Sequence, residues 1–124
     1  MSNNPVGWFE IYVQDMARAK AFYEAVFETR LEPLKSPPDL EMWAFPMHAG
    51  QAGASGALVR MNHGPSGGNT TLVYFSCLDC AVETSRALAN GGSICRERFS
   101  IGEYGFIALV ADTEGNVIGL HSRQ

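Results

Sequence analysis

The sequence lacks any long hydrophobic run and any excess of basic residues. No apolar stretch approaches the roughly 18 residues that a membrane-spanning helix requires. There are 13 acidic and 9 basic residues, which gives a formal net charge of −4, with both signs scattered along the chain. A nucleic-acid groove would need clustered lysine and arginine. We therefore expect neither a membrane nor a nucleic-acid partner.

Secretion signals and paired cysteines are missing as well. The first residues, Met1 to Pro5, have neither the basic nor the apolar segment of a signal peptide. The three cysteines, Cys77, Cys80 and Cys95, are an odd number, which favours free thiols and a cytoplasmic location. Cys77-Leu-Asp-Cys80 has the spacing of a redox pair if it opens a helix, whereas a zinc site would need a second pair. Because Cys77 lies on the apolar side of a predicted strand, we favour a structural role.

The chain does contain enough apolar side chain for one small core, since 46% of its 124 residues are hydrophobic. Alternating and helical periodicities predict strand, helix and three strands in its first half. The expected strands cover residues 6–13, 29–34, 40–45 and 56–61. Asp15 is the expected N-cap of the helix. The apolar stripe of this helix comprises Met16, Ala19, Phe22, Tyr23, Val26 and Phe27.

The second half repeats this order. The expected strands cover residues 70–77, 94–99, 106–111 and 116–121, with a hairpin turn at 112–115. Asp79 caps the expected helix, and Gly91-Gly92 ends it. We therefore predict a single α+β domain, 1–124, made of two β-α-β-β-β units. The units cover about 5–62 and 70–122, with a linker at 63–69, and form a curved eight-stranded mixed sheet, a cup, with the helices outside.

Two segments carry a recognisable pattern: Phe9-Glu-Ile-Tyr-Val-Gln-Asp-Met-Ala-Arg-Ala-Lys-Ala-Phe-Tyr-Glu-Ala-Val-Phe27 and Asp112-Thr-Glu-Gly-Asn-Val-Ile-Gly-Leu120. Both resemble the vicinal oxygen chelate superfamily, which includes glyoxalase I, bleomycin-resistance proteins and extradiol dioxygenases. Within the superfamily, the chain is most similar to small glyoxalase-like proteins. The resemblance implies a cup that binds a small molecule. In the metalloenzymes of the superfamily, a divalent metal lies at the base of this cup and is held by His, Glu or Gln side chains. One ligand comes from the first strand and one from the last strand of each unit.

The ligand positions that the resemblance implies hold other residues here. They fall on Trp8 and Leu72 in the first strands and on Gly119 in the closing strand. The remaining position lies within residues 56–59, and the sequence does not define which of these four residues occupies it. None of these side chains can coordinate a metal. We therefore predict no cofactor at the usual site.

A displaced site is an alternative. On strand parity, Glu10 shares the cup face with Trp8, and His121 shares it with Gly119. Glu10 and His121 are therefore candidate catalytic residues, either as an acid–base pair or as half of a shifted divalent-metal site. The other interpretation is that Glu10 is solvated or pairs with an arginine, while His121 lies in fraying terminal residues.

The expected ligand-binding residues are those that line the cup: Trp8, Tyr12, Arg60, Leu72, Tyr74 and Gly119. Aromatic walls suit a flat or apolar ligand, although the same side chains can also simply fill the cup. Arg60 either points an anion-binding guanidinium into the cup or forms a surface ion pair.

Three functions follow. The leading one is a glyoxalase-like protein that binds a small molecule without the usual metal ligands. The second is a lyase, isomerase or hydrolase that uses Glu10 and His121. The third is a protein-interaction module with a filled cup. We also expect a homodimer, since a domain of this size gains stability from covering an exposed sheet edge.

Overall fold

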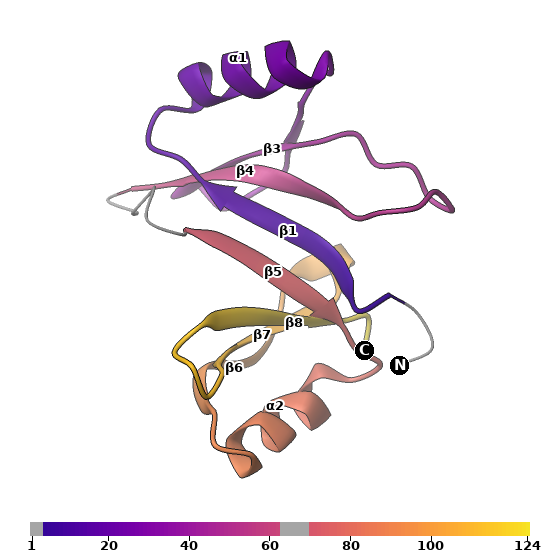
Figure 1. Ribbon diagram of the computed structural model, residues 1–124, viewed down its shortest axis with the longest axis vertical. Coiled ribbons are helices and arrows are strands. Elements are labelled where there is room, and N and C mark those ends of the chain that lie inside the picture. Colours follow the sequence, from indigo (N-terminus) through magenta and orange to yellow (C-terminus); the bar gives the residue numbers. More distant parts are fainter. Residues whose placement is uncertain (1–3, 63–69) are drawn as a thin grey trace. The chain divides into compact units, whose positions relative to one another are not determined.

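The computed structural model describes residues 4–62 and 70–124 (Figure 1). The linker predicted at 63–69, which includes His63, lies outside the described residues. Contacts within the chain divide it into two compact units. Trp8–Thr71 is called here the N-terminal unit, and residues 4–7 together with Leu72–Gln124 are called the C-terminal unit. Within the latter, the Ser76 amide donates to the Pro5 carbonyl oxygen.

In its described residues, the N-terminal unit contains one helix and four strands, the first of which begins at residues 6–7, which are counted with the other unit. The elements are β1 (Val6–Tyr12), α1 (Met16–Phe27), β2 (Glu32–Leu34), β3 (Leu40–Ala44) and β4 (Ser55–Met61). The strand order is β2-β3-β4-β1, in which β4 runs parallel to β1 and the other pairs are antiparallel. Each predicted element is present, although β2 is shorter than predicted because it begins only at Glu32.

The C-terminal unit repeats this plan. Its elements are β5 (Thr71–Ser76), α2 (Cys80–Ala89), β6 (Ser93–Ser100), a 3₁₀ turn (Gly102–Tyr104), β7 (Phe106–Ala111) and β8 (Val117–Ser122). The strand order is β5-β8-β7-β6, and β8 runs parallel to β5. The predicted α+β class, with eight strands in mixed pairing and two α-helices, is confirmed. The cup remains a prediction.

The helix boundaries have the chemistry that the sequence predicts. The Asp15 carboxylate accepts from the Arg18 amide and the Asp79 carboxylate from the Ala81 amide, each at 3.0 Å, so both aspartates are N-caps. The chain leaves α2 through Gly91, with φ at 94°, where glycine avoids the steric cost of the left-handed region. It leaves α1 through Glu28, with φ at 49°, which is not a glycine.

Each helix covers one face of its own sheet. In the N-terminal unit, Met16, Leu31 and Leu58 form the buried cluster; in the C-terminal unit, Cys80, Ala108, Val110 and Leu120 do so. The predicted apolar stripe of α1 is wider than its buried side. Ala19 and Tyr23 pack against the cluster, whereas Phe22, Val26 and Phe27 are exposed.

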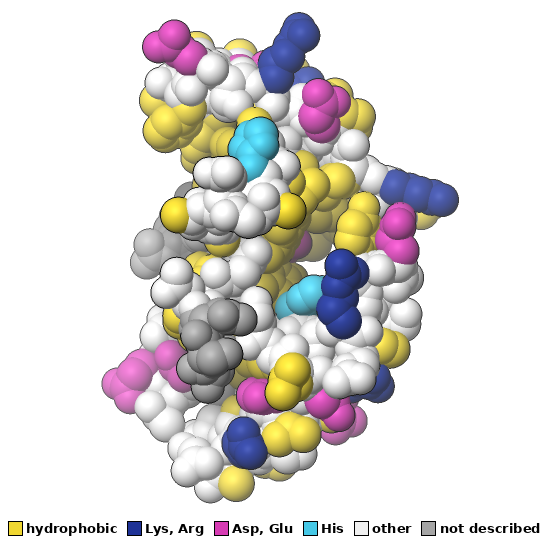
Figure 2. Space-filling model, turned by 90° about the vertical axis from the view of Figure 1, so that its right-hand side faces the viewer, with side chains coloured by type: hydrophobic (Ala, Val, Ile, Leu, Met, Phe, Trp, Pro, Cys, Tyr) yellow, Lys and Arg dark blue, Asp and Glu magenta, His cyan; other side chains and the backbone are white. Residues whose placement is uncertain are grey.

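The described surface carries mixed charge. Acidic and basic side chains are interspersed with hydrophobic ones on the face drawn in Figure 2. In the described residues, no helix is both long enough and apolar enough to cross a membrane.

Candidate functional site

Each unit has one sheet face that its helix leaves uncovered, which we call the helix-free face. In the N-terminal unit, Trp8, Glu10 and Tyr12 alternate with Phe9 and Ile11, and Ile11 packs into the cluster beneath α1. Trp8, Glu10 and Tyr12 therefore lie on the helix-free face. The parallel register pairs Glu10 with Ala57 and Tyr12 with Val59, so these two buried side chains belong to the same face.

The carboxylate of Glu10 lies between two aromatic side chains. The Trp8 indole Nε1 donates to Glu10 Oε2 at 3.2 Å, and the Tyr12 hydroxyl donates to Glu10 Oε1 at 2.8 Å. All three residues are half-buried. The two hydrogen bonds fix the carboxylate and tie both side chains to it. Glu10 is thus a half-buried carboxylate that accepts two hydrogen bonds from neighbouring rings.

The opposite face of the same unit carries a near copy of this contact. The Trp43 indole Nε1 donates to Glu41 Oε2 at 3.1 Å, again two residues away along a strand. The ammonium of Lys20 lies 3.2 Å from the centre of the Trp43 ring, so α1 covers this indole. The protein therefore contains a tryptophan–glutamate pair on each side of the sheet, one covered by the helix and one not.

In the C-terminal unit, Tyr74 lies against Gly119. The two residues are register partners on β5 and β8. A β-carbon added at position 119 would overlap the Tyr74 ring, whose Cγ is 2.8 Å from that point. The buried Tyr74 ring therefore occupies the space into which a side chain at 119 would project. Leu72 and His121 share this helix-free face by alternation along their strands.

His121 lies within β8 rather than in a frayed end. Its Nε2 is 2.6 Å from the carbonyl oxygen of Tyr104, in the 3₁₀ turn. A carbonyl oxygen only accepts, so Nε2 carries the proton, and in the neutral ring Nδ1 is left as the acceptor. The sequence alone could not identify Tyr104 as the partner, because the contact links residues 17 positions apart.

The divalent metal implied by the superfamily resemblance does not fit these residues. Trp8 and Leu72 offer no ligand atom, and the Tyr74 ring fills the space in front of Gly119. The register left open for 56–59 is now defined, and its candidates on the helix-free face, Ala57 and Val59, offer no ligand atom either. Within residues 4–62 and 70–124, no three His, Cys, Asp or Glu side chains form a group that can hold a metal ion.

Arg60 lies on the other side of its strand. It alternates with Val59 and pairs in register with Glu41, which puts it on the helix-covered face. Its side chain is exposed, and its Nε donates to the Gln14 carbonyl oxygen at 3.1 Å. This geometry gives Arg60 no contact with the face that carries Trp8.

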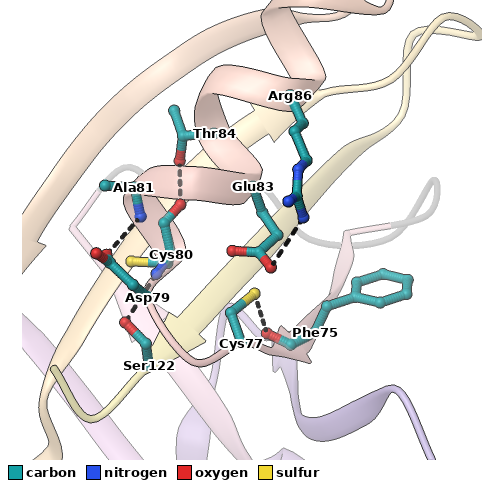
Figure 3. Close-up of polar contacts among 9 residues, drawn as sticks. All are labelled: Phe75, Cys77, Asp79, Cys80, Ala81, Glu83, Thr84, Arg86 and Ser122. Carbon is teal, nitrogen blue, oxygen red and sulfur yellow. Dashed lines mark hydrogen bonds and ion pairs between the residues drawn. The ribbon is translucent and has the colours of Figure 1, made fainter. Parts of the chain in front are cut away.

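The Cys77-x-x-Cys80 segment lies on the helix-covered side, at the start of α2 (Figure 3). Cys80 is fully buried in the core, and its amide donates to the Ser122 hydroxyl at 3.0 Å. Burial, and then the negative charge of Glu83, raises the pKa of Cys77 to about 11. A thiol with a raised pKa is a poor nucleophile, which supports the structural role.

A hollow of about 600 Å³ in the C-terminal unit also lies on the helix-covered side. It runs between α2 and β6 and is lined by Ala81, Thr84, Ser85, Leu88, Ala89, Ile94, Glu97 and Arg98. Arg98 is held there by Asp79, with 3.6 Å between Nε and Oδ1. Asp79 also caps α2, so we interpret the Asp79–Arg98 contact as part of the structure at the start of this helix.

Sequence comparison identifies one family. The model of the Glyoxalase/Bleomycin resistance protein/Dioxygenase superfamily matches residues 6–120. No curated protein matches the sequence.

Solved structures with the same fold include enzymes and proteins of unassigned function. Methylmalonyl-CoA epimerase from Mycobacterium tuberculosis has a TM-score of 0.71 at 15% identity, covering 97% of this chain and 88% of that one. A hypothetical protein from Bacillus halodurans has a TM-score of 0.76 at 11% identity, covering 100% and 96%. An uncharacterised protein from Methanosarcina mazei has a TM-score of 0.64 at 17% identity, covering 98% and 95%. At these identities the likeness concerns the fold.

Proposed function

Because the chain belongs to the Glyoxalase/Bleomycin resistance protein/Dioxygenase superfamily, we propose that the helix-free face of each unit binds a small molecule without a divalent metal at the usual positions. One observation carries the proposal: the Tyr74 ring fills the space where the closing-strand ligand of a metalloenzyme would project. A metal site at that place would require both a new side chain at Gly119 and displacement of the ring.

The Trp8–Glu10–Tyr12 arrangement supports binding of a flat or apolar molecule. The two hydrogen bonds to Glu10 hold both rings in place before a ligand arrives, and less side-chain freedom is then lost on binding. Aromatic side chains stack on planar ligands, and a polar group at the ring edge fixes orientation.

The two tryptophan–glutamate pairs provide the test. Each indole N–H gives its own proton–nitrogen NMR signal, and Trp8 and Trp43 are the only tryptophans. On titration with benzamide, a flat neutral probe, we expect the Trp8 signal to move and the Trp43 signal to stay. Trp43→Phe assigns the two signals. Equal movement of both signals, or of neither, would contradict the proposal.

Metal binding is tested separately. The protein is dialysed against Mn²⁺, Ni²⁺, Zn²⁺ or Fe²⁺, and the retained metal is measured by mass spectrometry. We expect less than one equivalent of each, with no turnover of α-keto or catechol substrates. A stoichiometric metal that supports turnover would overturn the metal-free proposal.

A second candidate, proton-transfer catalysis, is favoured by the environment of His121. The Tyr104 carbonyl holds the proton on Nε2, which leaves Nδ1 as a base. Among the fold neighbours are methylmalonyl-CoA epimerases, so methylmalonyl-CoA in deuterated water is the first probe. Catalysed deuterium uptake that is lost in His121→Ala and Glu10→Gln supports this function. Uptake that survives in both variants rules out these residues as the acid and base.

A further inference from the structure

Strand β6 forms one edge of the C-terminal unit and contains two irregularities. Its pairing with β7 shifts register between Ile94 and Arg96 and again between Arg96 and Phe99. In a regular strand, Arg96 would share a face with Ile94, and Phe99 would lie on the opposite face. Bulges redirect side chains, and they are frequent beside functional sites.

These shifts bring Arg96 and Phe99 to the same face. Arg96 pairs in register with Leu109, and Phe99 with Ile107. The guanidinium carbon of Arg96 lies 3.6 Å from the centre of the Phe99 ring, which confirms that the two side chains meet. Stacking on the ring holds the planar guanidinium while leaving its N–H groups at the rim available to a ligand.

The face that they share is the helix-free one. Leu109 pairs with Gly119, and Ile107 pairs with His121. One row across the four strands therefore reads Tyr74, Gly119, Leu109, Arg96. Neighbouring strands lie about 4.8 Å apart, so about 10 Å separates the backbone at Arg96 from that at Gly119. Half-buried Leu109 and Ile107 form an apolar floor between the cation and the aromatic ring.

Arg96 also differs from the other arginine of β6 in its partners. Arg98 lies over the Phe106 ring on the helix-covered side and contacts Asp79. In the described part of the chain, no ion pair involves Arg96. A stacked guanidinium without an internal carboxylate, at the edge of an apolar floor, has the chemistry of an oxyanion receptor.

We propose that Arg96 and Phe99 form an oxyanion subsite that binds the carboxylate or phosphate of a ligand whose apolar body lies over Leu109 and Ile107. This inference rests on the proposed function and names the ligand class: a small organic anion with a flat or apolar body. Arg96 binds the charged group in a bidentate manner, and Phe99 orients Arg96.

The test uses three probes of similar shape: benzoate, phenyl phosphate and neutral benzamide. Calorimetry measures affinity, and NMR signals of Leu109 and His121 report on the site. We expect at least one anion to bind more tightly than benzamide, and the preferred anion distinguishes a carboxylate from a phosphate ligand. Arg96→Gln should lower the affinity for that anion by about tenfold, as expected for loss of a charge-assisted contact. The affinity for benzamide should stay unchanged.

Arg98→Gln is the matched control, since it removes the same charge from the same strand but from the other face. It should leave both affinities unchanged. Arg96→Lys keeps the charge without the planar fork and should recover only part of the affinity.

The proposal is overturned if Arg96→Gln binds the anions as tightly as the wild type does. It is also overturned if Arg98→Gln lowers the anion affinity as much as Arg96→Gln does, because that would indicate a general effect of surface charge. If benzamide shifts the Trp8 signal and neither anion binds more tightly than benzamide, the subsite is contradicted and the proposed function is still supported. Anion binding at Arg96 with no response at Trp8 supports the subsite and contradicts the role of the N-terminal face.

Discussion

The two units follow the same order of elements but use different residues where each helix begins. Asp15 and Asp79 are equivalent N-caps. Met16 follows the first and Cys80 the second, and both side chains are buried in their cores. Two residues before each cap stand Val13 and Cys77, which pack at the edges of the same clusters. The Cys-x-x-Cys segment is therefore the counterpart of Val-x-x-Met, a pair of core positions.

The helix-free faces differ more strongly. In the N-terminal unit a carboxylate is held between two rings. In the C-terminal unit a tyrosine ring lies on a glycine, and a stacked guanidinium lies at the far edge. The same order of elements thus carries acidic and aromatic side chains on the helix-free face of the N-terminal unit. On the helix-free face of the C-terminal unit it carries cationic and apolar side chains.

The largest expected effect is in the core of the N-terminal unit. Leu58 is 0% exposed and packs with Met16 and Leu31, so Leu58→Ala should lower the free energy of unfolding by about 2–5 kcal/mol. Both tryptophans lie in this unit, and urea unfolding followed by their fluorescence measures the loss. Leu78→Ala, at a leucine that is 84% exposed, is the control and should change stability by less than about 0.5 kcal/mol. Equal losses in both variants would contradict the assigned core.

Because Cys77 is the counterpart of the core residue Val13, we expect its thiol to be unreactive. Its pKa is raised to about 11 from an ordinary 9.0, so at pH 8 its thiolate fraction should be about 100-fold below that of an unperturbed thiol. Alkylation by iodoacetamide, followed by mass spectrometry, should label the exposed Cys95 first. Because the folded state keeps the proton above pH 9, the contribution of this thiol to stability is lost as pH rises from about 9 to 11. Labelling of Cys77 as fast as Cys95 at pH 8 would restore the redox interpretation.

Much of the fold could be predicted from the sequence, because it depends on local patterns. Alternation of Trp8, Glu10 and Tyr12 with apolar neighbours identifies both the strand and its helix-free face. An aspartate before an apolar helical repeat identifies each helix start. Neither signal depends on partners distant in the sequence.

The rest depends on pairing between distant strands. The register of residues 56–59 follows from pairing with β1, and the positions of Arg96 and Phe99 follow from bulges in the pairing with β7. Alternation alone would put those two side chains on opposite faces. The position of Tyr74 over Gly119 also needs the β5–β8 register, which local periodicity does not contain.

Substitution of Gly119 tests the most distinctive contact of the C-terminal unit. Gly119→Ala puts a β-carbon into the Tyr74 ring and should cost about 1–3 kcal/mol, typical of overpacking. In a Tyr74→Ala background the space is free, so the same substitution should cost almost nothing. Thermal unfolding of the four proteins gives the coupling energy. Additive losses would mean that the ring and the glycine do not compete for this space.

The smallest effect separates the two helix caps. Asp15→Ala and Asp79→Ala each remove an N-cap hydrogen bond, which should cost about 1 kcal/mol. Asp79 also contacts Arg98 Nε at 3.6 Å, a contact that links α2 to β6, whereas Asp15 contacts Arg18 of its own helix at 4.0 Å. The loss at Asp79 should therefore exceed that at Asp15 by about 0.3 kcal/mol, in the range of partly exposed ion pairs. Exposed Asp39→Ala controls for the lost charge, and the Asp79 excess should vanish in an Arg98→Gln background. An excess that persists there would assign the difference to the cap itself rather than to the helix–strand contact.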